Sequence, residues 1–193
     1  YISKSNIADF KMRIFNADGS EAKMCGNGIR CVGKFVYDKG YTDKKFISIE
    51  TLSGVKYLTL QVAGGKVKTV AVDMGQAKAE KPINLTVDGE TVSLIPVSVG
   101  NPHAVIFVDD IEKAPLTKLG PIIEHHEAFP DGVNVEFVEV LGEDKLRMRV
   151  WERGSGVTMA CGTGACASVM AAIAAKHCHY DETVSVVLDG GIL

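Results

Sequence analysis

MCGNGIRC, residues 24–31, and MACGTGAC, residues 159–166, carry the same Cys-Gly-x-Gly pattern. At the same offset of 136 residues and without a gap, MRIF at 12–15 aligns with MRVW at 148–151. In both places a strand-like segment leads through a polar loop to the cysteine turn, and a helix-like segment follows. Chance gives one such turn easily, but a strand match at the same offset is far rarer. The repeat therefore predicts two similar halves.

The hydrophobic pattern predicts a mixed α/β fold built mostly from strands. Two helices are expected directly after the glycine turns, at about 27–39 and 163–177, and a short third helix near 115–124. Turn dipeptides such as Asp-Gly and Gly-Gly separate the alternating apolar segments. The segments predicted as strands are 12–15, 46–51, 56–62, 68–74, 93–99, 104–108, 133–140, 145–151 and 183–188. The pattern alone leaves the boundary between the halves open, at 65–75 or at 78–92.

Composition and charge exclude several classes of protein. Of the 193 residues, 46% are hydrophobic and 23% are charged, and the formal net charge is −3. Without a basic stripe, a nucleic-acid partner is not expected. No apolar run is long enough to span a membrane, and no signal-peptide pattern is present. Five cysteines at spacings that match no disulfide framework indicate a reducing compartment, so we expect a cytoplasmic protein.

The duplicated cysteine turn has a chemical interpretation. A cysteine at the first turn of a helix lies beside unpaired backbone N–H groups and the positive end of the helix dipole, which should lower its pKa. The glycines let the backbone approach a ligand, and the N–H groups suit a carboxylate. Two such turns facing one carbon would allow Cys25 and Cys161 to remove a proton from one face and deliver one to the other. This chemistry inverts a stereocentre without a cofactor.

The cysteines also have more ordinary possible roles. We expect Cys31, Cys166 and Cys178 to be small packing residues in or near helices. The cysteine spacings do not fit a zinc site or a redox pair, so no metal is expected. A disulfide between Cys25 and Cys161 is not expected to persist in a reducing compartment. If it formed, it would be an oxidised, inactive form.

Four segments around these turns are distinctive: NADGSEAKMCGNGIRC (16–31), GNPHAVIFVDD (100–110), GVNVEFVEV (132–140) and WERGSGVTMACGTGACA (151–167). In this order, and over nearly the whole chain, they resemble the diaminopimelate epimerase family. The resemblance implies an α/β (α+β) fold of two pseudo-symmetric domains, each a central helix wrapped by mostly antiparallel strands, with the active site in the cleft between them. It favours the earlier boundary, so the expected halves are 1–69 and 70–193.

The resemblance also implies an activity. Members interconvert LL- and meso-diaminopimelate for lysine and peptidoglycan synthesis, without pyridoxal phosphate or any other cofactor, and a homodimer is the family expectation. Cys25 and Cys161 would be the acid/base pair, with Glu152 and His103 helping to set their protonation. The residues expected to bind the substrate are Asn16, Gly26, Asn27, Asn101, Asn134, Glu152, Arg153, Gly162 and Thr163.

The residue types suit these roles, but other interpretations stay open. An arginine fork matches a carboxylate, and asparagine both donates and accepts hydrogen bonds. Asn16, Asn101 and Asn134 could instead be turn residues. His103 could be a core histidine, and Glu152 with Arg153 a solvated surface pair.

The chain also differs from the family at its ends. The family's first strands and its closing strands are expected to lie outside these 193 residues, which would leave the first half with unpaired strand edges. The alternatives are a proline racemase, a phenazine-type isomerase and a protein that binds an anion without chemistry. The lead-in ERGSG and the motifs GNPH and GVN argue against the first, and the cysteine pair argues against the second.

Overall fold

The computed structural model describes residues 1–15, 19 and 21–193, which divide into two compact units, Tyr1–Gly75 (unit 1) and Gln76–Leu193 (unit 2). The division predicted between residues 69 and 70 falls inside strand β7 (Lys66–Val72). This strand is hydrogen-bonded along its length to β6 (Gly54–Ala63), so the complete hairpin belongs to unit 1. That the two units are the halves of one epimerase stays a prediction.

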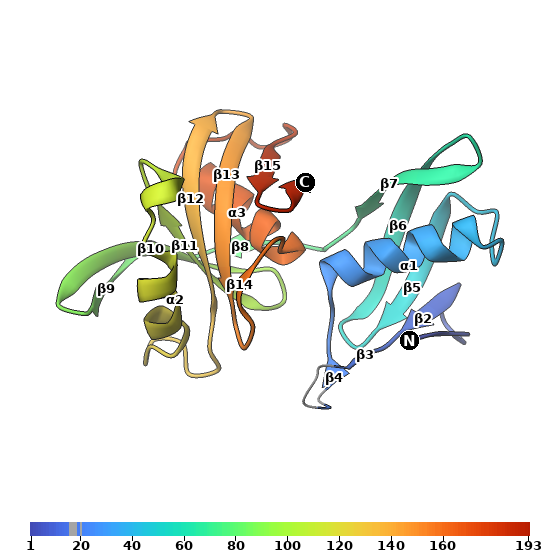
Figure 1. Cartoon of the computed structure of the whole chain (residues 1–193), viewed down its shortest axis with the longest axis horizontal. Coiled ribbons are helices and arrows are strands. Elements are labelled where there is room, and N and C mark those ends of the chain that lie inside the picture. The colour runs from blue at the N-terminus through green and yellow to red at the C-terminus, as the bar shows by residue number, and fades with distance from the viewer. Residues whose placement is uncertain (16–18, 20) are drawn as a thin grey trace. The chain divides into compact units, whose positions relative to one another are not determined.

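Unit 1 is a five-stranded sheet with one long helix on it. The strand order is β1-β2-β5-β6-β7, in which β2 and β5 are parallel and the other neighbours are antiparallel. Helix α1 (Gly26–Asp38) lies across the sheet (Figure 1). The remaining strands are β1 (Ile2–Ser3), β2 (Phe10–Met12) and β5 (Phe46–Thr51), with β3 (Ile14–Phe15) and β4 (Glu21–Ala22) forming a separate pair.

The core of unit 1 follows from the spacing of apolar residues on α1. Ile29, Val32 and Val36 recur every three or four residues, so they share one helix face. That face packs against the sheet, where Ile47 and Leu58 are fully buried. The helix therefore has a fixed orientation on its own sheet, and this fixes where its first turn lies within unit 1.

Unit 2 is a larger mixed sheet with a helix on each face. Its main path is β16-β15-β13-β12-β11-β10-β8, with β14 beside β13 and β9 beside β10. The pairs β11–β12 and β13–β15 are parallel, and the other pairs are antiparallel. The strands are β8 (Lys78–Ala79), β9 (Ile83–Val87), β10 (Glu90–Ser98), β11 (Pro102–Phe107), β12 (Asn134–Gly142), β13 (Lys145–Glu152), β14 (Gly156–Thr158), β15 (Ser185–Leu188) and β16 (Gly191–Ile192).

The two faces of this sheet bury different kinds of residue. Helix α2 (Leu116–Glu124), preceded by the short 3-10 helix η1 (Ile111–Lys113), packs on an apolar core that includes Phe137. Helix α3 (Gly162–Ala174) packs against β8 and β10–β13. Residues alternate between the faces of a strand, so the neighbours of Phe137 at positions 136 and 138 point to the α3 side.

The mixed α/β fold predicted from the sequence is confirmed, although the short strands β1, β4, β8, β14 and β16 were not predicted and other details also differ. MRIF is split between β2 and β3, which lie in different sheets. Strand β9 was not predicted, although Asp88 and Gly89 (φ 53° and 78°) form the kind of turn that joins antiparallel strands. Helix α3 ends at Ala174, because Lys176 takes a left-handed backbone (φ 66°) that stops the helix.

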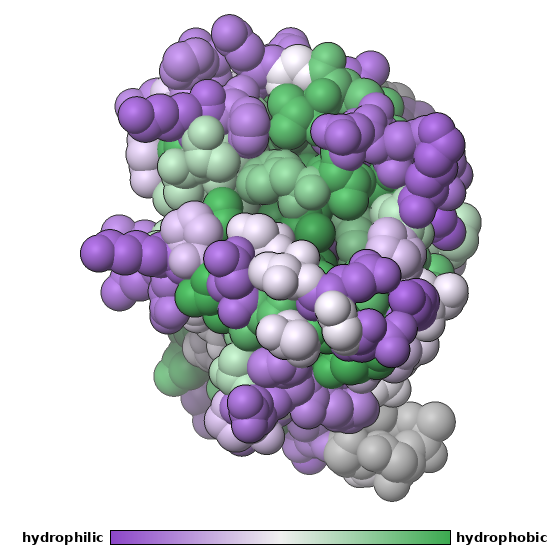
Figure 2. Space-filling view, turned by 90° about the vertical axis from the view of Figure 1, so that its left-hand side faces the viewer, coloured by the Kyte–Doolittle hydropathy of each residue, from purple (hydrophilic) through white to green (hydrophobic). Residues whose placement is uncertain are grey.

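The surface matches the mixed composition of the chain. On the face seen in Figure 2, hydrophilic side chains surround a smaller area of apolar ones. Among the described residues, the helices are too short or too polar to cross a membrane.

Candidate active site

The first cysteine turn begins helix α1. Cys25 is the N-cap residue, with extended backbone angles (φ −141°, ψ 112°), and its Sγ accepts a hydrogen bond from the backbone N of Gly28 at 3.3 Å. Its carbonyl accepts from Ile29 N at 3.0 Å, which closes the first turn. Gly26 and Asn27 are the first two helical residues, at the end where a helix directs its N–H groups away from itself. The side chain of Cys25 is half-buried.

The second cysteine turn has nearly the same geometry. Cys161 caps α3 with φ −132° and ψ 111°, and its Sγ accepts from Gly164 N at 3.4 Å. Gly162 and Thr163 take the positions that Gly26 and Asn27 take in α1. The sequence repeat is therefore also a repeat of local structure in each unit.

The environment of Cys161 corrects one expectation. Its side chain is buried, with 6% of the residue exposed, and burial raises the pKa of the thiol to about 12. The negative charges of Glu136 and Glu152 act in the same direction, whereas hydrogen bonds from Thr163 and Gly164 N act against it. The prediction that the helix terminus lowers the pKa is wrong for Cys161, because loss of solvent outweighs the helix N–H groups.

A chain of hydrogen bonds links the first turn of α3 to the sheet. Asn101, in the turn before β11, donates from Nδ2 to Thr163 Oγ1 at 3.3 Å. The Oδ1 atom of Asn101 is 3.1 Å from Nε2 of His103, which is the second residue of β11 and is 1% exposed. Thr163 Oγ1 is in turn 3.6 Å from Cys161 Sγ. Three predicted site residues thus meet at the second cysteine.

Glu136 is a member of this cluster that the sequence prediction missed. It lies on β12 with 0% exposure, and its Oε1 is 2.7 Å from Nδ1 of His103. The parallel register of β11 and β12 pairs His103 with Asn134, two residues from Glu136 on the same face. The available signal was a carboxylate in the largely apolar stretch VNVEFV, because a charged residue is rarely buried unless it has a partner.

Asn134 and Arg153 are joined through the backbone. The Asn134 side chain donates to Pro102 O at 3.0 Å and accepts from the backbone N of Arg153 at 3.0 Å. Arg153 is exposed, and its guanidinium donates to Asp131 O at 2.7 Å. Asn134 therefore fixes the position of the loop that carries Arg153.

Glu152 and Glu124 hold the two sides of the same loop. The carboxylate of Glu152, the last residue of β13, accepts a hydrogen bond from the Thr158 hydroxyl on β14. Glu124, at the end of α2, is 5% exposed and accepts from Trp151 Nε1 at 2.7 Å and from Gly154 N at 2.8 Å. Glu124 was not predicted from the sequence, and it shapes the turn between β13 and β14.

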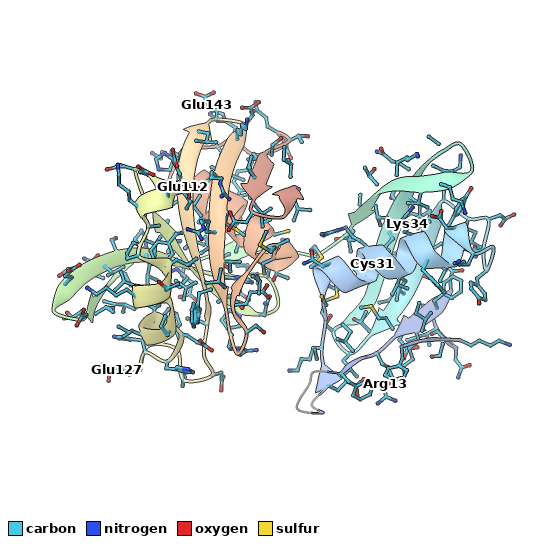
Figure 3. The ribbon with its side chains drawn as sticks, viewed as in Figure 1. Arg13, Cys31, Lys34, Glu112, Glu127 and Glu143 are labelled. Atoms are coloured by element: carbon cyan, nitrogen blue, oxygen red, sulfur yellow. The ribbon has the colours of Figure 1, made fainter. Side chains whose placement is uncertain are left out.

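The structure thus brings together the predicted site residues of unit 2, while Cys25, Gly26 and Asn27 lie together in unit 1. Asn16 lies outside the described residues. Of the cysteines expected to pack, Cys178 is buried, Cys166 is half-buried and Cys31 is exposed. Cys31 was therefore assigned wrongly, because it lies on the solvent side of α1 (Figure 3). Within the described residues, no three His, Cys, Asp or Glu side chains are arranged to hold a metal ion.

Solved structures show the same fold at low sequence identity. A hydroxyproline epimerase from Agrobacterium vitis matches with a TM-score of 0.79 and 17% identity, over 98% of this chain and 64% of that one. A Bacillus anthracis phenazine biosynthesis protein of the PhzF family matches with a TM-score of 0.76 and 17% identity, over 99% of this chain and 73% of that one. These similarities support the predicted two-domain fold.

Sequence comparisons are more specific. The chain is 55% identical to a diaminopimelate epimerase of Phocaeicola vulgatus over 89% of this chain and 66% of that protein. It is 52% identical to a diaminopimelate epimerase of Bacteroides thetaiotaomicron over 98% of this chain and 70% of that protein. The chain thus spans about two thirds of the length of these relatives. The diaminopimelate epimerase family model matches residues 1–80 and 95–193, and the chain belongs to the diaminopimelate epimerase family.

Proposed function

We propose that this protein interconverts LL- and meso-diaminopimelate, with Cys25 and Cys161 as its two acid/base groups. The observation that carries the proposal is the pair of cysteine N-caps. Each sulfur accepts a hydrogen bond from the third residue of its helix, with nearly equal backbone angles, in a member of the diaminopimelate epimerase family. A single cap would be ordinary local structure. Two matching caps suit a reaction that needs one acid/base group on each face of a carbon.

The proposed reaction moves two protons and no electrons. The Cys25 thiolate removes the α-hydrogen of the substrate, and the Cys161 thiol gives its proton to the opposite face of the same carbon. The inverted product leaves with Cys25 protonated and Cys161 as thiolate, and the reverse reaction runs with the roles exchanged. Cys161 is assigned the initial donor role because its buried environment favours the thiol.

The first helical residues would bind the reacting end of the substrate. N–H groups at a helix N-terminus suit an anion, so we assign the α-carboxylate to the backbone of Gly26 and Asn27 on α1 and of Gly162 and Thr163 on α3. The same N–H groups would stabilise the negative charge that develops when the α-hydrogen leaves. No metal or pyridoxal phosphate is required by this scheme.

The other predicted residues are assigned to the distal end and to proton control. Arg153 has an exposed guanidinium that can pair with the distal carboxylate, and Asn134 holds its loop. Asn101 and Asn16 remain proposed substrate ligands. Glu152 and His103 are proposed to influence the protonation of the cysteines. We further propose a cytoplasmic homodimer that supplies lysine and peptidoglycan precursors.

The test is exchange of the α-hydrogen in deuterium oxide with the full-length protein. Wild-type protein should incorporate deuterium into LL-diaminopimelate and invert it, but should not exchange L-proline. Cys161→Ala and Cys25→Ala should each lose inversion by about 10²–10⁴-fold, the range for removing an acid/base group. Cys31→Ala is the matched control, because this exposed cysteine lies on α1 beyond the cysteine turn.

Inversion at the wild-type rate in both alanine variants would refute the two-cysteine mechanism. Exchange of L-proline but not of LL-diaminopimelate would assign the protein to the proline racemases. Tight substrate binding without exchange in the wild type would leave a binding protein rather than an enzyme.

A further inference from the structure

Glu136 is a buried carboxyl group that the proposed reaction does not use. It is fully buried on β12, and among the described residues its Oε2 is a buried side-chain oxygen without a hydrogen-bond partner. Its Oε1 packs against the first turn of α3, because a Cβ atom added to Gly164 would lie 2.8 Å from it. The same added atom would lie 3.2 Å from Cys161 Sγ, so the carboxyl group and the thiol are near neighbours.

Hydrogen bonds connect Glu136 to the first turn of α3 through His103 and Asn101. Asn101 uses Nδ2 to donate to Thr163, and its Oδ1 lies 3.1 Å from Nε2 of His103. The Nδ1 atom of His103 lies 2.7 Å from Glu136 Oε1, within hydrogen-bond distance. Glu136 is thus hydrogen-bonded to His103 inside the sheet, with its Oε1 against the first turn of α3 that also carries Cys161.

Several of the strands that contact α3 carry ionisable residues. Glu136 and Glu152 both disfavour the thiolate, and His103 lies behind Glu136. Arg147 and Arg149 on β13 pair with Asp189, and Glu139 on β12 accepts from the backbone of Ile111. The remaining ionisable residues of the strands that contact α3 are exposed, namely Lys78, Glu90 and Lys145.

We propose that Glu136 is a positioning residue that keeps Cys161 in the thiol form. The consequence for catalysis rests on the proposed function: a proton donor must be protonated before substrate arrives. The carboxyl group then disfavours the thiolate left after transfer and promotes its reprotonation. A Cβ atom at position 164 would have to displace this carboxyl group.

The test measures the thiol directly, without turnover. Iodoacetamide reacts with thiolate and is uncharged, so removing a protein charge does not change its attraction to the site. In the full-length protein, the alkylation rate of Cys161 is followed from pH 7 to 9 by mass spectrometry of its peptide. The alkylation rate of the exposed Cys31 is the internal reference for reagent strength. The rate of the buried Cys178 is the reference for opening of unit 2.

Three variants separate the effect of the Glu136 charge on the Cys161 thiol from the effect of Glu136 packing. Glu136→Gln keeps the shape and removes the charge, Glu136→Asp keeps the charge and shortens the side chain, and Glu139→Gln removes a charge elsewhere on β12. We expect Glu136→Gln to raise the alkylation rate of Cys161 at pH 8 about threefold to tenfold, where tenfold corresponds to one pKa unit. Glu136→Asp and Glu139→Gln should stay within about twofold of the wild type, less than a third of a pKa unit.

Two outcomes overturn the proposal. The first is a Cys161 rate in Glu136→Gln that equals or falls below the wild-type rate. The second is an equal increase of the Cys161 alkylation rate in Glu136→Gln and Glu136→Asp, whether or not Cys178 is also alkylated faster. Packing and not charge would then control the reactivity of the thiol. The alkylation assay contains no substrate. Its outcome therefore tests the role of Glu136 even if the protein proves not to be an epimerase.

Discussion

Replacing Gly164 by alanine should destabilise unit 2, whereas the equivalent replacement in unit 1, Gly28→Ala, should not. Both glycines are the third residue of their helix, and both donate their N–H to the capping cysteine. An added Cβ at Gly28 meets only Cys25 atoms, at an ordinary 3.5 Å. At Gly164 the same atom would lie 2.8 Å from the Glu136 carboxyl oxygen.

The magnitude follows from two opposing effects. Alanine is favoured over glycine in a helix by up to about 1 kcal/mol, which should stabilise Gly28→Ala by about 0.5–1 kcal/mol. At Gly164 this gain is opposed by overpacking, which costs about 1–3 kcal/mol. The carboxyl group is held by His103 at 2.7 Å, so it cannot move away without losing that contact. A net loss of about 1–2 kcal/mol is expected for Gly164→Ala.

Urea unfolding of the full-length protein measures both effects. Trp151 is the only tryptophan in the sequence and lies in unit 2, so its fluorescence follows that unit, while far-ultraviolet circular dichroism follows both. Gly164→Ala should lower the midpoint of the fluorescence transition, and Gly28→Ala should leave it unchanged. Equal or greater stability of unit 2 in Gly164→Ala would refute the packing of Glu136 against the turn.

Three further perturbations test other parts of unit 2. Gly120→Ala places a Cβ 2.7 Å from the Trp151 ring, so overpacking should lower stability by about 1–3 kcal/mol in urea unfolding; no loss would contradict the contact between α2 and β13. Glu124→Ala leaves Trp151 Nε1 and Gly154 N without their acceptor and should cost about 2–3 kcal/mol, while the exposed Glu127→Ala should change the midpoint little. Alkaline pH should also weaken unit 2: between pH 9 and 12 the unfolded chain releases the Cys161 proton and the folded chain keeps it, so the unfolding free energy falls with rising pH by up to about 1.4 kcal/mol per unit. Cys161→Ala should remove this contribution to the pH dependence of the unfolding free energy. An identical pH dependence in both proteins would show that folding does not hold the proton on the Cys161 thiol.

Much of the fold could be predicted from local patterns. The alternation of apolar residues located β5 at 46–51 as observed, and the glycine turns located the starts of α1 and α3 within one residue. Strand β9 was missed because it is only five residues long and has only two buried side chains. The division between the units depends on which strand β7 pairs with, and pairing between strands is not a local property.

The sequence by itself determined the two cysteine turns, because capping depends on residues within one helical turn. It also indicated the family, because the motifs around those turns are specific. Only the tertiary structure decided the state of Cys161, since Glu136 is 25 positions away in the chain and reaches the thiol through the packing of β12 on α3. Burial and charge act across such distant contacts, so one Cys-Gly-x-Gly motif occurs with a half-buried sulfur in α1 and a buried thiol beside carboxylates in α3.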